Sequence, residues 1–374
     1  MGPLHGTRII EIAGIGPTQL CGMLLADMGA EVLRLRRPAA ADTGIDLPAR
    51  FNLMNRGRPT IDVDLKSDAG RQLLLRLCET ADVLFEGLRP GVMERLGLGP
   101  GDCMARNERL VYGRMTGWGQ DGPLARRAGH DTNYIAAAGA LHGIGYADRP
   151  PPLPLNLIGD FGGGALYLAV GLLAALLEAG RSGQGQVVDA AMVDGTASML
   201  TLFYGLQAGG IWTDARENNL LDGGAPFARC YETRDHRYIA VCALETGFFA
   251  NLLQAMAVDD IDPAEQYDTD KWPRHREILA RVFRGRTRDE WSGLLSGIDA
   301  CATPVLTLGE AAEHEHAQAR GTYVDIEGIR QPGPAPRFSR TASEARPAPS
   351  DQREAARKTM LNWGLAEDEV RQLL

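Results

Sequence analysis

The 374-residue sequence has little of what several protein classes require, beginning with positive charge. Its 39 Lys and Arg residues are outnumbered by 48 Asp and Glu residues, which gives a net charge of −9. Nucleic acids and anionic membranes both attract clustered positive charge, so we expect neither as the main partner. The six cysteines form no CxxC pair and no metal-ligand spacing, and no signal peptide is visible. We therefore expect free thiols, no metal site and a cytoplasmic location.

Long hydrophobic runs are also scarce. A single apolar stretch, Phe161 to Ala179, has the length needed to cross a membrane. It begins at three consecutive glycines and contains Glu178 near its end. These features favour a helix buried on all sides of a globular core, so we expect no membrane span.

Strand-like and helix-like segments alternate over the first 115 residues. Strands are predicted at Arg8–Ala13, Glu31–Leu35, Thr60–Leu65, Asp82–Glu86 and Leu110–Met115, with helix-length segments between most of them. This alternation predicts an α/β fold with a doubly wound parallel sheet and helices on both faces. Such sheets bind ligands at the carboxyl ends of their strands.

The rest of the chain indicates a second, smaller domain. We expect a large domain over residues 1–210, mainly helical after residue 129, with one further strand near Gly185–Ala190. A small α+β domain is expected over residues 223–325, with strands at Arg229–Glu232 and Tyr238–Cys242. Residues 331–349 are rich in proline and predict an extended segment, followed by a polar helix at the carboxyl end.

Arginines cluster near the ends of the predicted strands. They are Arg34, Arg36, Arg37, Arg56, Arg58, Arg89 and Arg95. Because the carboxyl ends of parallel strands share one edge of a sheet, these side chains could converge on a multiply phosphorylated ligand. Spacing alone favours the other interpretation, that these are solvated surface charges, because arginine is common at loop entries.

Two further segments carry groups suited to proton transfer. Gly129-His130-Asp131 offers an imidazole, the usual general base near neutral pH, although such a pair is often only a structural hydrogen bond. Gly159-Asp160 precedes Gly162, Gly163 and Gly164 at the start of the long apolar helix, where Asp160 could simply be the N-cap. Three glycines in a first turn disfavour a helix, which points to close approach of a ligand or another backbone. Backbone N–H groups at that helix end could also stabilise an oxyanion.

At these residues the sequence resembles the family III CoA-transferases over essentially its whole length. The matching pieces are Gly87–Val92, Arg95–Gly99, Arg114–Gln120, Ala128–Asp131 with Asn133-Tyr134, Asn156-Leu157, Gly159–Gly164, Gly185–Met192 and Pro336–Thr341. The stretch from Ala39 to Arg50 carries no distinctive motif of the family.

The resemblance implies both a fold and an activity. The family has a doubly wound large domain, here completed by residues 330–374, and forms an interlocked homodimer whose active sites are shared between subunits. Its transferases use an aspartate, here Asp160, as a nucleophile toward the acyl group. Its racemase branch, which acts on 2-methylacyl-CoA thioesters, also has the histidine found here as His130. Because His130 is present, the resemblance favours inversion at the α-carbon through an enolate, by 1,1-proton transfer between His130 and Asp160.

The resemblance also implies roles for other residues. Glu245 would orient His130 from the second subunit, and Asp131 would be a supporting polar residue. The CoA-binding residues would be Arg37, Arg89, Arg95, Met115, Tyr134, Gly162 and Gly163, although Met115 and Tyr134 could equally be core residues. CoA would be part of the substrate, so no separate cofactor is expected. The alternatives are a CoA-transferase acting through an aspartyl-CoA thioester at Asp160, and a non-catalytic acyl-CoA-binding protein.

Overall fold

The computed structural model describes residues 2–38 and 47–373, so most of the stretch without a family motif lies outside the described residues. The chain divides into two compact units. Unit 1 contains Met1–Ala138, Pro154–Met199 and Glu315–Leu374, and unit 2 contains Gly139–Leu153 and Leu200–His314. Residues 139–153 and 200–210, expected in the large domain, thus belong to the second unit.

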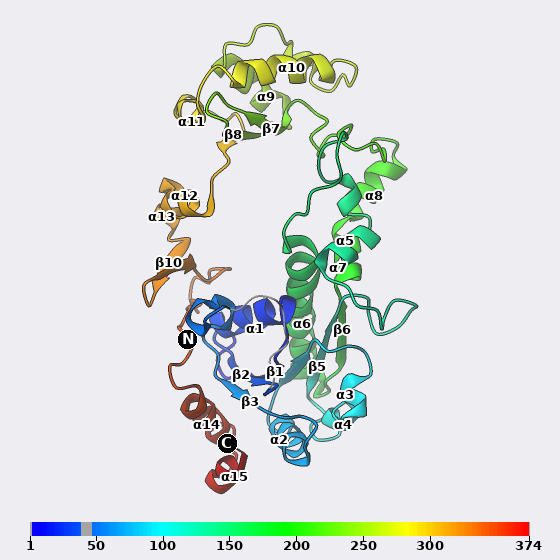
Figure 1. The fold of residues 1–374 in the computed structure, drawn as a ribbon, viewed down its shortest axis with the longest axis vertical. Coiled ribbons are helices and arrows are strands. Elements are labelled where there is room, and N and C mark those ends of the chain that lie inside the picture. The colour runs from blue at the N-terminus through cyan, green and yellow to red at the C-terminus, as the bar shows by residue number, and fades with distance from the viewer. Residues whose placement is uncertain (1, 39–46, 374) are drawn as a thin grey trace. The chain divides into compact units, whose positions relative to one another are not determined.

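Unit 1 is built on a six-stranded sheet, shown in Figure 1. Its strands are β1 (Arg8–Ile12), β2 (Glu31–Arg36), β3 (Thr60–Asp62), β4 (Val83–Glu86), β5 (Val111–Thr116) and β6 (Val187–Ala191). All neighbouring pairs are parallel, in the order β3-β2-β1-β4-β5-β6. The predicted parallel sheet is therefore confirmed. The strand order reverses between β1 and β4, and sheets of this kind bind ligands at that point.

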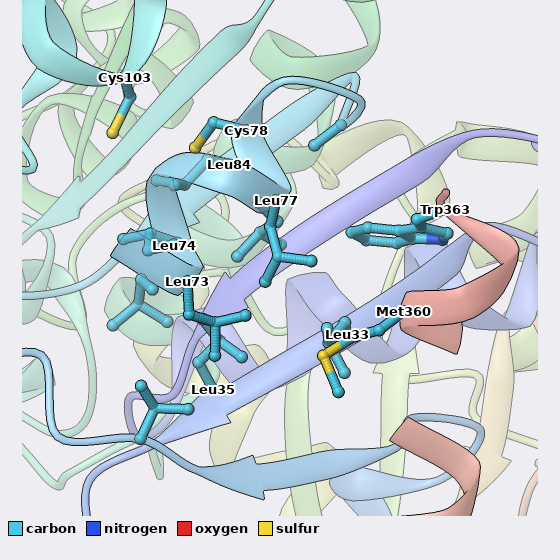
Figure 2. Packing of buried hydrophobic residues seen from close by; sticks show 14 of the residues in the cluster. Leu33, Leu35, Leu73, Leu74, Leu77, Cys78, Leu84, Cys103, Met360 and Trp363 are labelled. Carbon is cyan, nitrogen blue, oxygen red and sulfur yellow. The ribbon is translucent and has the colours of Figure 1, made fainter. Parts of the chain in front are cut away.

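Helices cover both faces of this sheet because the apolar strand residues alternate in direction. Ile9, Val32 and Val83 pack with α1 (Pro17–Asp27) and α6 (Tyr167–Ser182). The next residue of a strand, such as Leu33 after Val32, faces the other side of the sheet. These residues pack with α2 (Asp68–Cys78) and α14 (Gln352–Asn362), as Figure 2 shows. Trp363 and Met360 from the carboxyl end are fully buried in this second core.

Unit 1 also contains several further helices and one hairpin. They are η1 (Ala49–Phe51), η2 (Leu53–Asn55), α3 (Val92–Arg95), α4 (Pro100–Met104), α5 (Asp131–Ala137), the π-helix η4 (Leu157–Leu166), α7 (Met192–Met199), α13 (Glu315–Arg320), the hairpin β10 (Tyr323–Ile326) and β11 (Ile329–Pro332), and α15 (Glu367–Leu373).

Unit 2 has its own core around an antiparallel sheet of β7 (Ala228–Glu232), β8 (Tyr238–Cys242) and β9 (Ala302–Pro304). Its helices are η3 (Leu141–Gly143), α8 (Thr201–Ala208), α9 (Thr246–Ala255), η5 (Pro263–Glu265), α10 (Trp272–Phe283), α11 (Arg288–Leu295) and α12 (Leu308–Glu313). Aromatic side chains dominate this core, with the rings of Tyr231 and Phe283 stacked 4.8 Å apart. The predicted β8 strand has the expected bounds.

The expectation that the apolar helix is buried on all sides is wrong. Within unit 1, one side of α6 packs on the sheet, while Leu166, Val170 and Leu177 are 49%, 66% and 59% exposed. Residues Leu157–Ser182 have the length and composition of a membrane-spanning helix, with 39% of the window buried in the chain. Core helices of globular proteins meet the same criterion, so a membrane span is not established.

Candidate active site

A pocket of about 750 Å³ lies in unit 1 at the carboxyl ends of three strands. Its walls include residues that follow β1 (Ile15–Gln19), β4 (Gly87–Pro90) and β5 (Gly117 and Trp118). This is the edge of the sheet, next to the reversal in strand order, at which the sequence predicted ligand binding. His130 and Asp160 both line the pocket, so the structure brings the two predicted acid/base groups to one cavity.

Asp160 lies in the first turn of η4, not at its N-cap as the sequence suggested, because the helix begins three residues earlier. One carboxylate oxygen, Oδ2, accepts a hydrogen bond of 3.2 Å from the Asn156 side chain. Burial raises the pKa of Asp160 above its ordinary value, and the Asp131 charge raises it further, while Asn156 and His130 lower it. A carboxyl group with a raised pKa is a stronger base, and its pKa lies nearer to neutral pH, where a general acid or base works best.

Gly16 brings the start of α1 against the Asp160 carboxylate. Its φ of +62° is favourable for glycine, and a Cβ atom at this position would lie 2.9 Å from Asp160 Oδ2. Any larger residue would therefore both strain the turn and press on the carboxylate. Gly16 was not predicted as a site residue, because nothing in the neighbouring sequence links it to Asp160.

Asp131 connects α5 to the turn that carries Asp160. It is 4% exposed, and its Oδ2 accepts backbone N–H bonds from Gly159 at 2.7 Å and Asp160 at 2.8 Å. Its other oxygen, Oδ1, has no hydrogen-bond partner among the described residues. The geometry gives Asp131 a positioning contact with Asp160, which agrees with a supporting role.

His130 is the exposed residue that immediately precedes α5. Its backbone N–H donates to Asn133 Oδ1 at 3.0 Å, and the Asn133 backbone N–H donates back to the His130 carbonyl at 2.8 Å. This reciprocal pair fixes the backbone at the helix start, as capping interactions do. His130 therefore lines the pocket from a fixed backbone.

Tyr134 and Met115 also line the pocket, although both are largely buried. The Tyr134 ring lies edge-on to Trp118 with centroids 4.8 Å apart, and its hydroxyl donates to the Gly129 carbonyl. A Cβ atom on Gly117 would lie 2.1 Å from this ring. Burial raises the pKa of Tyr134 to about 12, the Asp160 charge adds to this and Arg89 opposes it. Tyr134 therefore remains a neutral, rigid wall beside Asp160.

The glycines of η4 have a packing explanation. A Cβ atom on Gly163 would lie 2.7 Å from the Thr196 backbone nitrogen, and one on Gly164 would lie 2.9 Å from Met192 Cγ. Both contacts are with α7, which approaches η4 closely. Gly162 and Gly163 lie outside the lining of the pocket. The sequence allowed close approach of either a ligand or another backbone, and the second of these accounts for Gly163.

The arginines separate into two groups. Arg34 and Arg58 are buried in ion pairs with Glu11, and Arg56 is buried in a pair with Asp27. Arg34 thereby joins β2 to β1, and Arg56 joins α1 to β11 through further bonds to Gln331 and Pro332. All three arginines are buried outside the lining of the pocket, so they are not surface charges.

The exposed arginines differ in their position relative to the pocket. Arg89 lines it, while Arg37 and Arg95 are exposed outside its lining. Arg127 also lines the pocket. Arg127 was not predicted as a site residue because it follows no predicted strand.

Glu245 belongs to unit 2, where it is the exposed residue before α9. The other predicted site residues all belong to unit 1.

Several known proteins resemble this chain over nearly its whole length. The model of CoA-transferase family III matches residues 4–353. The α-methylacyl-CoA racemase of Mus musculus is 41% identical over 99% of this chain and 96% of its own length, and that of Homo sapiens is 38% identical over the same shares. The crystal structure of a CAIB/BAIF family protein from Brucella suis superposes with a TM-score of 0.80 at 26% identity, covering 96% of this chain and 99% of that one.

Proposed function

The chain belongs to CoA-transferase family III, and we propose that it is a racemase that inverts the α-carbon of 2-methylacyl-CoA thioesters. The observation that carries this proposal is that His130 and Asp160 line a single pocket in a chain 41% identical to an α-methylacyl-CoA racemase. A nucleophilic transferase mechanism gives no role to an imidazole beside the aspartate.

The proposed reaction is a 1,1-proton transfer. One of the two groups removes the α-proton, the thioester carbonyl takes up the negative charge as an enolate, and the other group delivers a proton to the opposite face. A neutral imidazole and a protonated carboxyl group form one working pair, and their exchanged protonation states form the pair for the reverse direction. The raised pKa of Asp160 favours this arrangement. Because CoA is carried by the substrate, no separate cofactor is needed.

Substrate binding would use the remaining walls of the pocket. Arg89 and Arg127 are its cationic side chains among the described residues and suit the phosphates of CoA. Arg37 and Arg95, which lie outside this lining, would contact more distant parts of the nucleotide. Met115 and Tyr134 would line the acyl path.

We further propose a homodimer in which Glu245 of a second copy orients His130. The exposed apolar side of α6, with Val170 and Leu177, supports a protein partner, because apolar surface of this kind is normally covered. Co-expressing a His130→Ala chain with a Glu245→Gln chain tests this. Sharing between copies would restore one intact site in each mixed dimer, whereas sites within single chains would leave every site defective.

The racemase and transferase proposals are separated by incubating one enantiomer of a 2-methylacyl-CoA in heavy water. A racemase would produce the other enantiomer with deuterium at the α-carbon, and His130→Ala or Asp160→Ala would reduce this by at least about 100-fold. A transferase would require an acceptor acid and would form an aspartyl adduct that hydroxylamine traps. Near-normal racemisation by both variants would refute the assignment.

A further inference from the structure

Glu86 is a buried carboxylate directly behind one wall of the pocket. It is the last residue of β4 and is 2% exposed. Its Oε2 accepts the Leu88 backbone N–H at 2.5 Å. Leu88 belongs to the Gly87–Pro90 loop, which lines the pocket and carries Arg89. The carboxylate thus holds the loop from behind without itself lining the pocket.

Arg114 joins this carboxylate to the far end of the same segment. It lies opposite Glu86 in the register of β4 and β5, with Nε 3.6 Å from Glu86 Oε1. Its NH2 group also donates to Glu94 of α3 at 2.6 Å. The buried Arg114 guanidinium therefore contacts both Glu86, just before this segment, and Glu94, at its far end.

The loop has little room to move on its other side. A Cβ atom on Gly87 would lie 2.9 Å from Thr18 Cγ2, and Thr18 is itself buried at the start of α1. A buried charge is costly unless it is paired, so removing either Glu86 or Arg114 would leave the other charge buried without its partner. Arg114 Nε has no hydrogen-bond partner among the described residues and meets Glu86 only as an ion pair. The hydrogen bonds of Glu86 to Leu88 and of Arg114 to Glu94 are therefore the contacts that fix the two ends of this segment.

We propose that Glu86 and Arg114 are positioning residues that hold the Gly87–Pro90 loop, and with it Arg89, in place to bind the acyl-CoA. The inference rests on the proposed function, since it assigns Arg89 to the substrate. Disturbing the pair would weaken substrate binding more than it slows proton transfer, because His130 and Asp160 are held by other elements.

The pair also introduces a pH dependence. Burial raises the pKa of Glu86 to about 7, while the Leu88 N–H and Arg114 lower it and Glu94 raises it. Tyr112, on the same strand as Arg114, also lies within electrostatic range of Glu86. Ionised Glu86 is the stronger acceptor for the Leu88 N–H and the partner for Arg114. KM should therefore fall as pH rises through about 7.

Glu86→Gln separates this effect from the catalytic groups. Glutamine keeps the size of the side chain and an acceptor for the Leu88 N–H, but it cannot ionise. At pH 8 the KM should therefore rise about three- to tenfold, and the decrease in KM near pH 7 should disappear. kcat and its own pH dependence should change by less than about twofold. Glu86→Ala also removes the acceptor and should raise KM further. Glu108→Gln, an exposed residue just before β5, is the matched control and should leave both parameters unchanged.

Calorimetric binding of CoA itself distinguishes failure of this inference from failure of the proposed function. Weaker CoA binding by Glu86→Gln, with the wild-type pH dependence lost, supports the positioning pair even if no racemase activity is found. A wild-type protein that racemises its substrate while Glu86→Gln keeps the same KM and pH profile refutes the pair alone. A kcat that falls as much as KM rises also refutes it, because the effect would then extend to the catalytic groups.

Discussion

Replacing Asp131 by alanine tests how the catalytic turn is held. The substitution removes the acceptor for two backbone N–H groups, those of Gly159 and Asp160. A hydrogen bond to a charged group contributes about 1.5–3 kcal/mol, so the two together are worth roughly 3–6 kcal/mol. Part of this is offset, because the variant no longer buries Oδ1, which lacks a partner among the described residues. We expect the free energy of unfolding to fall by about 2–4 kcal/mol.

The same substitution should affect catalysis. Without Asp131 the first turn of η4 is free to shift, and a displacement of about 1 Å at a reacting group can cost about 100-fold in rate. Racemisation should therefore fall by about that factor even where the protein remains folded. Asp131→Asn keeps one acceptor oxygen and should cost only about 1 kcal/mol of stability. It also removes a charge that raises the pKa of Asp160, so that pKa should decrease.

Urea denaturation followed by circular dichroism measures the stability, and deuterium incorporation measures the rate. Asp121→Ala changes an exposed carboxylate and is the control. An Asp131→Ala protein that unfolds at the wild-type urea concentration and racemises at the wild-type rate would refute this account of the turn.

Three other predictions concern single residues. The pKa of Glu86 is raised from 4.5 to about 7 in the folded protein, so the folded state binds this proton more tightly than the unfolded state does. The free energy of unfolding therefore contains a contribution of roughly 3 kcal/mol that is complete below about pH 4.5 and is lost as pH rises through 7. Glu86→Gln should flatten this part of a plot of stability, measured by urea denaturation, against pH, and an unchanged plot would contradict the prediction. Gly163→Ala should destabilise the protein by about 1–3 kcal/mol more than Gly162→Ala, because its Cβ atom would lie 2.7 Å from the Thr196 nitrogen rather than 3.2 Å from its nearest neighbour; equal melting temperatures would contradict the packing explanation. Asn156→Ala removes a hydrogen bond that lowers the pKa of Asp160, so the corresponding limb of the kcat–pH profile should move to higher pH, and a move to lower pH would contradict the assignment.

The strands of unit 1 could be predicted because their signals are local. β1, β2 and β4 are short apolar runs bounded by turns, and the structure places them within one or two residues of the expected bounds. The parallel arrangement followed from the helix-length segments between most of them. The hairpin of β10 and β11 was missed because its strands contain Asp325, Arg330 and Pro332, which weaken the apolar signal.

The candidate site was only partly predictable because much of it depends on distant contacts. His130 and Asp160 were found from local motifs, and their placement in one pocket required the fold. The contact of Gly16 with Asp160 joins residues far apart in the sequence, so no local pattern indicates it. Likewise, the sequence left Arg34 open as a ligand-binding residue or a surface charge, and its buried pairing with Glu11 depends on contacts between two strands.

The exposure of one side of α6 could not be predicted from the sequence either. A sequence reports that Val170 and Leu177 are apolar, and it does not report whether the same chain or another one covers them. Within the described part of unit 1 these side chains remain exposed.

The central claim is that His130 and Asp160 act on opposite faces of one carbon acid. The most direct test is α-proton exchange in heavy water from each pure enantiomer of a 2-methylacyl-CoA, with His130→Ala and Asp160→Ala measured separately. We predict that neither variant racemises, and that each still exchanges the α-proton of one enantiomer only, with opposite preferences. Exchange of both enantiomers by either variant, or the same preference in both, would contradict the two-base mechanism.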